Sequence, residues 1–186
     1  MKKQIRVLGF DDAPFEKHSR GKVPVIGVFF RGGDMLDGIL ATEVDIDGDD
    51  STETLIKTIN KSKFKPQLRA VFLDGIAFGG FNVIDIEELN KKTNVPIIVI
   101  IRKSPDVAEM KNLLKRLKMN DKIKILSKAG KVYDAGKIFV QIRGIDIDGA
   151  REIVKISSTH SYIPEALRVA HMIGHALKKG ESRGRA

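Results

Sequence analysis

The sequence predicts an α/β fold in which a mixed five-stranded sheet lies between two layers of helices. Three observations lead to this fold: antiparallel strands open the chain, helices and strands alternate afterwards, and the later strands are continuously apolar. Continuous apolar runs indicate strands that are covered on both faces. We expect the strand order 3-2-1-4-5, because right-handed crossovers place the fourth strand beside the first.

Three antiparallel strands are expected at the start of the chain. Ile5–Phe10 is a short apolar run, and Val23–Phe30 is a longer continuous one. Arg31-Gly-Gly-Asp34 has the composition of a hairpin turn. From Leu40 to Ile46, apolar and polar side chains alternate with the period of two that marks a half-buried strand.

Helices and strands alternate in the rest of the chain. The sequence predicts a helix that starts at Asp49–Glu53, and further helices over 83–91, 107–117, 148–157 and 164–178. Strands over 68–73 and 95–101 complete the five-stranded sheet, and short strands are expected over 123–126 and 137–142. We expect residues 1–180 to form a single domain, followed by a short basic tail over 181–186.

Composition excludes several classes of protein. The chain of 186 residues is 42% apolar with charges spread along it, which excludes a disordered protein. No apolar run approaches the roughly 20 residues that span a membrane. The absence of cysteine excludes disulfides and thiolate metal sites and favours an intracellular, cytoplasmic protein. A net charge of +9 favours a polyanionic partner such as nucleic acid, while two Tyr and no Trp argue against extensive base stacking.

Two aspartates follow neighbouring strands of the predicted sheet. Asp74 comes directly after the buried strand 68–73, and Asp11 comes at the end of the first strand. Ligands of open α/β sheets bind beyond the carboxyl ends of the strands, and the expected order places these two ends side by side. Paired carboxylates repel unless a cation or a shared proton offsets their charge, so the pair predicts a Mg²⁺ or Mn²⁺ site. A simple Asp-Gly turn is the alternative for Asp74.

Other polar residues give weaker indications of a functional site. His171 and His175 lie four residues apart, which is the spacing of a zinc pair, but without an obvious third ligand we interpret them as helix surface or boundary. Arg102 and Lys103 follow the strand 95–101 and could meet a phosphate at the same edge of the sheet. Alternatively, both residues could lie in a solvent-exposed segment that leads into the next helix.

Four segments carry a resemblance to a known family: Gly9-Phe10-Asp11, Phe72-Leu-Asp74-Gly75, Pro96-Ile-Ile-Val, and Thr159-His160-Ser-Tyr-Ile-Pro-Glu165-Ala166. Over nearly its whole length the chain is identified as a member of an uncharacterised, mostly archaeal protein family. That family resembles endonuclease V through these four segments. The resemblance implies a ribonuclease H-like three-layer α/β/α architecture.

The resemblance also implies a set of site residues. Asp11 and Asp74 would be metal ligands for Mg²⁺ or Mn²⁺, and His160 would be the active-site histidine. Asp50 is the best counterpart of the catalytic glutamate of endonuclease V, with Asp47 and Asp49 as rivals. Two alternatives stay open: Asp50 could cap a helix in a capping box with Glu53, and His160 could lie in a solvated loop or at a helix cap.

One departure from endonuclease V affects the expected substrate. Endonuclease V carries an aromatic, proline-containing wedge before its catalytic glutamate, and nothing between Phe30 and Asp50 matches it. We therefore do not expect recognition of a flipped base. The sequence favours a metal-dependent nuclease or nucleic-acid-binding protein acting on DNA or RNA. The alternatives are a non-catalytic nucleic-acid-binding domain that kept the fold, and a phosphohydrolase of small molecules.

Overall fold

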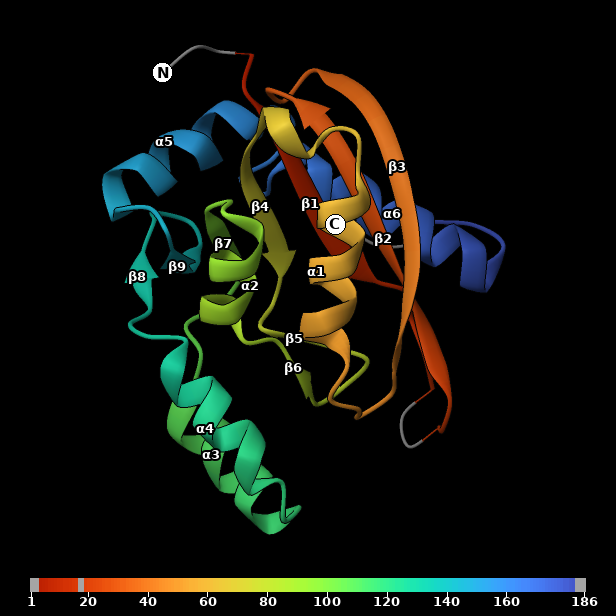
Figure 1. The fold of residues 1–186 in the computed structure, drawn as a ribbon, viewed down its shortest axis with the longest axis vertical. Helices are drawn as coiled ribbons and strands as arrows, with labels where there is room; N and C mark the ends of the chain where they lie inside the picture. Colours follow the sequence, from red (N-terminus) through yellow and green to blue (C-terminus); the bar gives the residue numbers. More distant parts are fainter. Residues whose placement is uncertain (1–3, 17–18, 183–186) are drawn as a thin grey trace.

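The structure, a computed structural model, describes residues 4–16 and 19–182 and is organised around one mixed sheet (Figure 1). The sheet has seven strands in the order β3-β2-β1-β4-β7-β9-β8. Their bounds are Arg6–Asp12 (β1), Lys22–Arg31 (β2), Met35–Asp45 (β3), Leu68–Asp74 (β4), Ile97–Ile101 (β7), Tyr133–Asp134 (β8) and Phe139–Arg143 (β9). A separate hairpin follows β4 and consists of Ala77–Phe78 (β5) and Asn82–Val83 (β6).

The strand order confirms the predicted arrangement of the first five strands, but the sheet is larger than predicted. β9 pairs antiparallel with β7, and β8 pairs with β9, so the sheet has seven strands rather than five. β8 has only two residues, which is too short to leave a periodic pattern in the sequence. β1, β4 and β7 run parallel to one another, so their carboxyl ends meet at one side of the sheet, which we call the carboxyl edge.

Helices cover both faces of the sheet. In Figure 1, α1 (Ser51–Lys61) and α2 (Ile86–Thr93) lie in front of the sheet, and α6 (Glu165–Lys179) lies behind it. α5 (Ile147–Ser157) shares the hydrophobic core of α6, and a 3-10 turn (η1, Lys65–Gln67) leads into β4. The central strands β1, β2, β4 and β7 contribute to both cores because their side chains alternate between the two faces.

α3 (Val107–Arg116) and α4 (Asn120–Lys128) form a helical hairpin that projects from the rest of the domain (Figure 1). The strand predicted over 123–126 is wrong, because these residues belong to α4. Ile123 and Leu126 are three residues apart and pack toward the same core as Leu114 of α3. A short apolar run of this kind fits a helix and a strand equally well by its pattern alone.

α6 lies directly against β1 because Gly9 has no side chain. A Cβ atom at Gly9 would lie 2.8 Å from backbone atoms of Ala166 and Leu167. Further along the helix, a Cβ atom at Gly174 would lie 3.1 Å from the Cα atom of Ala13. These close approaches align α6 with β1 and bring the middle of the helix to the carboxyl edge.

Among the described residues, no helix is long and apolar enough to cross a membrane. Of the basic tail predicted over 181–186, residues 183–186 lie outside the part of the chain that the structure describes.

Candidate metal centre

Three side chains converge at the carboxyl edge. Phe10 of β1 pairs with Leu73 of β4, so the next residues, Asp11 and Asp74, lie side by side. One ligand atom each from Asp11, Asp74 and His171 of α6 lie within 4.8 Å of one another. They line a cavity of about 510 Å³ together with Asp12, Ala13, Pro14, Phe15, Arg102 and His175. The predicted adjacency of Asp11 and Asp74 is confirmed.

Each of the two carboxylates has a basic partner. Nδ1 of His171 lies 2.9 Å from Oδ2 of Asp11. Nη2 of Arg102 donates a hydrogen bond of 2.6 Å to Oδ2 of Asp74. Arg102 directly follows β7, so the neighbouring parallel strand supplies the positive charge for the carboxylate of β4. These two partners offset the repulsion between the carboxylates.

Burial sets the protonation of the cluster. Asp11 is only 5% exposed. Burial raises its pKa, the hydrogen bond with His171 opposes the rise, and the charge of Asp74 adds to it. The hydrogen bond with Asp11 raises the pKa of His171 above its ordinary value of 6.5, although burial opposes this. Burial also raises the pKa of Asp12 to about 6, against a hydrogen bond from the backbone N–H of Gly79. A cation that binds these side chains would compete with protons for the same atoms.

The donor set fits a divalent cation. Two carboxylates and an imidazole are ligand types that divalent cations use in proteins, and water could complete the coordination. His175 stacks on His171 with 4.4 Å between the ring centroids. Nδ1 of His175 is buried and has no hydrogen-bond partner among the described residues. An unpartnered nitrogen in the same cavity is a further potential donor to a ligand.

Asp50 lies outside this cluster, so the structure does not bring the predicted third aspartate together with Asp11 and Asp74. Its Oδ1 accepts a hydrogen bond of 3.0 Å from the backbone N–H of Asp45 and one of 2.6 Å from the side-chain amide of Asn82. The carboxylate thereby ties the end of β3 to β6. Asp50 does stand at the N-cap position of α1, but its side chain makes no capping hydrogen bond, so the predicted capping box with Glu53 is also wrong.

The two rival aspartates also make contacts away from the cluster. Oδ1 of Asp47 accepts a hydrogen bond from the backbone N–H of Phe81, and Asp49 lies 3.3 Å from Nζ of Lys122. The loop between β3 and α1 is thus fastened to the β5–β6 hairpin and to α4. No carboxylate from this loop joins Asp11 and Asp74 in the cluster found among the described residues, and His171 takes the third place instead.

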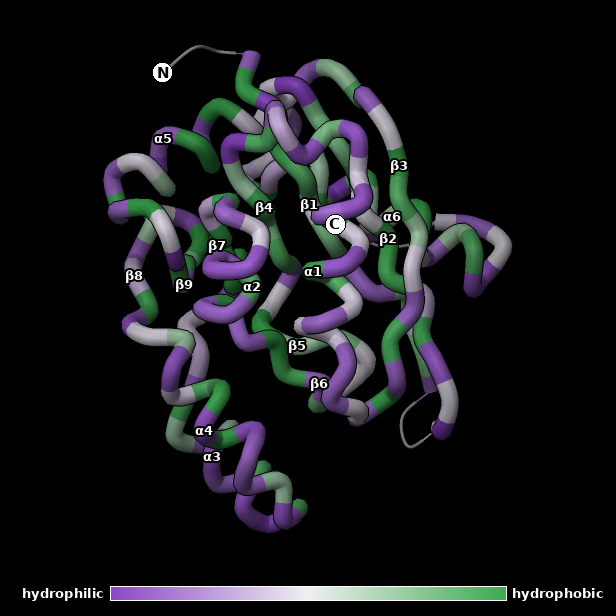
Figure 2. Tube along the Cα trace, in the orientation of Figure 1, coloured by the Kyte–Doolittle hydropathy of each residue, from purple (hydrophilic) through white to green (hydrophobic). Residues whose placement is uncertain are grey.

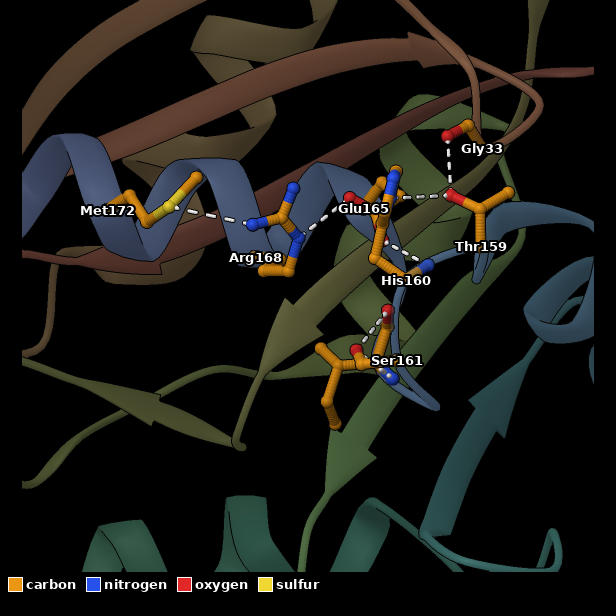
Figure 3. Close-up of polar contacts among 8 residues, drawn as sticks. Gly33, Thr159, His160, Ser161, Glu165, Arg168 and Met172 are labelled. Carbon is orange, nitrogen blue, oxygen red and sulfur yellow. Dashed lines mark hydrogen bonds and ion pairs between the residues drawn. The ribbon is translucent and has the colours of Figure 1, made fainter. Parts of the chain in front are cut away.

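His160 lies at the opposite edge of the sheet from Asp11. Thr159 donates a hydrogen bond to the carbonyl of Gly33, in the β2–β3 hairpin beyond the first residues of β1 (Figure 3). The backbone N–H of His160 donates to the carboxylate of Glu165, and its ring lies 3.3 Å from the same carboxylate. Its side chain is 73% exposed. The geometry supports the alternative interpretation, a residue in a solvated loop, which here precedes α6.

The sequence predicts His171 to be a helix surface or boundary residue, and it is indeed only partly buried on α6, but its ring also contacts Asp11. Nothing in its own segment marks it, because its partner Asp11 is 160 residues away in the sequence. The small residues Gly9, Ala166 and Gly174 could have indicated this contact, because they allow α6, which carries His171, to lie close against β1, which carries Asp11.

The chain resembles known proteins in both sequence and fold. The chain matches the family described as Endonuclease dU over residues 3–178. A UPF0215 protein of Methanothermobacter thermautotrophicus is 46% identical over 191 residues, which cover 100% of this chain and 94% of the relative. A crystal structure of an Archaeoglobus fulgidus protein superposes with a TM-score of 0.87 and 35% identity over 94% of this chain and 98% of that one.

Endonuclease V is similar in fold. The Ciona intestinalis enzyme, crystallised with a 24mer DNA, superposes with a TM-score of 0.56 at 18% identity over 90% of this chain and 83% of the enzyme. This likeness confirms an α/β fold resembling endonuclease V, and the relatives confirm the predicted resemblance to an archaeal family. The chain belongs to the Endonuclease dU family.

Proposed function

We propose that this protein is an endonuclease that hydrolyses phosphodiester bonds with a divalent cation, Mg²⁺ or Mn²⁺, held by Asp11, Asp74 and His171. The observation that carries the proposal is the convergence of these three side chains at the carboxyl edge. The family description, which names an endonuclease, and the fold shared with endonuclease V support it.

The chain's own groups have distinct roles in this proposal. A bound cation would supply an activated water and stabilise the leaving oxygen. Asp11 and Asp74 would give up their ion pairs with His171 and Arg102 to hold it. The guanidinium of Arg102, whose side chain is 37% exposed, would then be free to bind a phosphate oxygen of the substrate.

The family description also suggests a substrate, DNA that contains deoxyuridine. The segment between Phe30 and Asp50 contains no aromatic residue and no proline, and most of it is the strand β3. This segment therefore has no side chain that could insert into a duplex and help to extrude a base. We therefore expect strands with deoxyinosine to be cut no better than ordinary strands.

A cleavage assay on matched oligonucleotides tests the proposal. Unmodified, deoxyuridine-containing and deoxyinosine-containing DNA of one sequence, single- and double-stranded, and the corresponding RNA would be incubated with Mn²⁺ or with EDTA. We expect cleavage only with the cation, and comparison of the deoxyuridine strand with the unmodified strand tests the substrate that the family description suggests. If Mn²⁺ leaves every strand intact, the protein is not an endonuclease on these substrates, and a non-catalytic binding domain becomes the better proposal.

Metal binding should depend on pH in a defined direction. Because the hydrogen bond with Asp11 raises the pKa of His171, a cation that binds its ring nitrogen must compete with a proton there. Affinity for Mn²⁺ should therefore rise with pH, by up to about tenfold per unit while one proton is displaced. Calorimetry in buffers of different ionisation enthalpy measures both the affinity and the protons released. A pH-independent affinity without proton release would contradict the assignment of His171 as a ligand.

A further inference from the structure

The positive charge of this protein is concentrated in one projecting element. We call residues 107–131, which comprise α3, α4 and the turns that follow them, the arm. The arm contains eight Lys or Arg and two Asp or Glu, so its 25 residues carry +6 of the net +9 of the whole chain. Figure 2 shows hydrophilic residues along both helices of this projection. Such a concentration of positive charge produces a strong local electrostatic field that attracts polyanions.

The arm is fixed at the same edge as the candidate metal centre. β7 ends at Ile101, Arg102 binds Asp74, and α3 begins at Val107. In the first turn of α4, close to the turn between α3 and α4, the buried Nζ of Lys122 donates hydrogen bonds of 2.7 and 2.6 Å to the carbonyls of Asp47 and Gly48 in the loop after β3. The arm is therefore anchored to the sheet body rather than tethered by a flexible linker.

Several basic side chains of the arm are not used within the protein. Lys124 pairs with Asp121, and Lys128 with Asp85. By contrast, no ion pair among the described residues involves the exposed side chains at the tip: Lys115, Arg116 and Lys118. Basic residues in the last turn of a helix stabilise its dipole. That role accounts for Lys115 and Arg116 but not for Lys118, which lies beyond the helix.

We infer that the arm binds the phosphate backbone of nucleic acid beside the metal centre. Residues 107–131 contain no Phe, Trp or Tyr, so the arm has no platform for stacking bases. Its contacts with nucleic acid are then ionic and independent of sequence, and they weaken steeply with salt. The link between the arm and cleavage rests on the proposed endonuclease function, whereas phosphate binding by the arm does not require the cation.

The test compares two triple variants that remove the same charges. The arm variant is Lys115→Gln, Arg116→Gln, Lys118→Gln. The control is Lys61→Gln, Lys63→Gln, Arg69→Gln, which removes two lysines and one arginine at the opposite edge of the sheet. Arg69 lines a second cavity there, of about 820 Å³, with Arg6 and Arg31, so the control also tests the rival basic surface. Affinity for a short DNA duplex would be measured in EDTA over a series of salt concentrations.

We expect the arm variant to bind the duplex at least about tenfold more weakly, with a log–log salt slope lower by roughly two to three. The control should keep the wild-type slope. Lys115→Arg with Lys118→Arg should bind as wild type, and a loss in this charge-conserving variant would contradict phosphate binding. Equal losses in the arm and control variants, or none in the arm variant, would also overturn the inference. So would tighter binding of polyglutamate than of DNA, which would indicate an acidic protein partner.

Binding and cleavage separate this inference from the proposed function. If the arm variant loses affinity while wild-type protein cuts no strand, the arm binds nucleic acid and the endonuclease proposal fails. If wild-type protein cuts DNA while the arm variant binds and cuts it equally well, the endonuclease stands and the arm inference fails.

Discussion

Asp74→Asn should lower the rate of Mn²⁺-dependent cleavage by roughly a thousandfold while leaving the fold intact. Asparagine has the shape of aspartate, so the packing at the end of β4 is kept. The substitution removes one of the two carboxylates that would hold the cation, and it leaves Arg102 without its anionic partner. Single-turnover cleavage with saturating protein measures the loss without interference from binding.

Asp148→Asn is the matched control for this substitution. Asp148 also pairs with an arginine, Arg151, but its side chain is 88% exposed on α5. This variant should cut at the wild-type rate. In EDTA, Asp74→Asn should bind nucleic acid as tightly as wild type or more tightly, because a carboxylate that faces phosphate is repulsive. Wild-type cleavage by Asp74→Asn would rule out the aspartate as a ligand.

Gly9→Val should destabilise the protein by about 3 kcal/mol and also weaken Mn²⁺ binding. Even a Cβ atom at this position would lie 2.8 Å from the backbone of Ala166 and Leu167, where no flexible side chain can move aside. α6 would be forced away from β1, and His171 would move with it away from Asp11. Denaturant unfolding measures the loss of stability, and calorimetry at a temperature where the variant is folded measures the metal affinity.

Gly149→Ala provides the comparison for Gly9. The nearest atoms to a Cβ at Gly149 are side-chain atoms of Ile145 and Asp146, at 3.0 to 3.1 Å, and these can shift. Alanine also improves helix propensity, so the stability should change by no more than about 1 kcal/mol. If Gly9→Val proved as stable as this control, the close packing of α6 on β1 would not be what positions His171.

The central part of the fold could be predicted because it follows from local patterns and simple topology. Continuous apolar runs marked β4 and β7, and the right-handed crossover rule placed β1 beside β4. At the far edge of the sheet, the strand predicted over 137–142 corresponds to β9, but the rest of this edge was not predicted. β8 has only two residues, and the apolar residues of 123–126 fit a strand pattern although they form part of α4.

The candidate site, like the fold, could be predicted only in part. Asp11 and Asp74 each end a strand, so local sequence and strand order together predicted their meeting. His171 reaches Asp11 only through the packing of α6 on Gly9, which is a tertiary contact without a local signature. Asp50 and His160 were proposed from similarity to endonuclease V, and the structure gives both of them contacts elsewhere. Sequence similarity located the segments, but it did not decide which side chains face the cavity.

Anomalous diffraction from crystals soaked in Mn²⁺ tests the central claim most directly. The account predicts one strong peak at the carboxyl edge, about 2.0–2.3 Å from an oxygen of Asp11, an oxygen of Asp74 and a nitrogen of His171. Asp74→Asn crystals soaked in the same way should lose that peak. Wild-type crystals without a peak there, or with Mn²⁺ bound only at other carboxylates, would contradict the claim that these three residues form a metal centre.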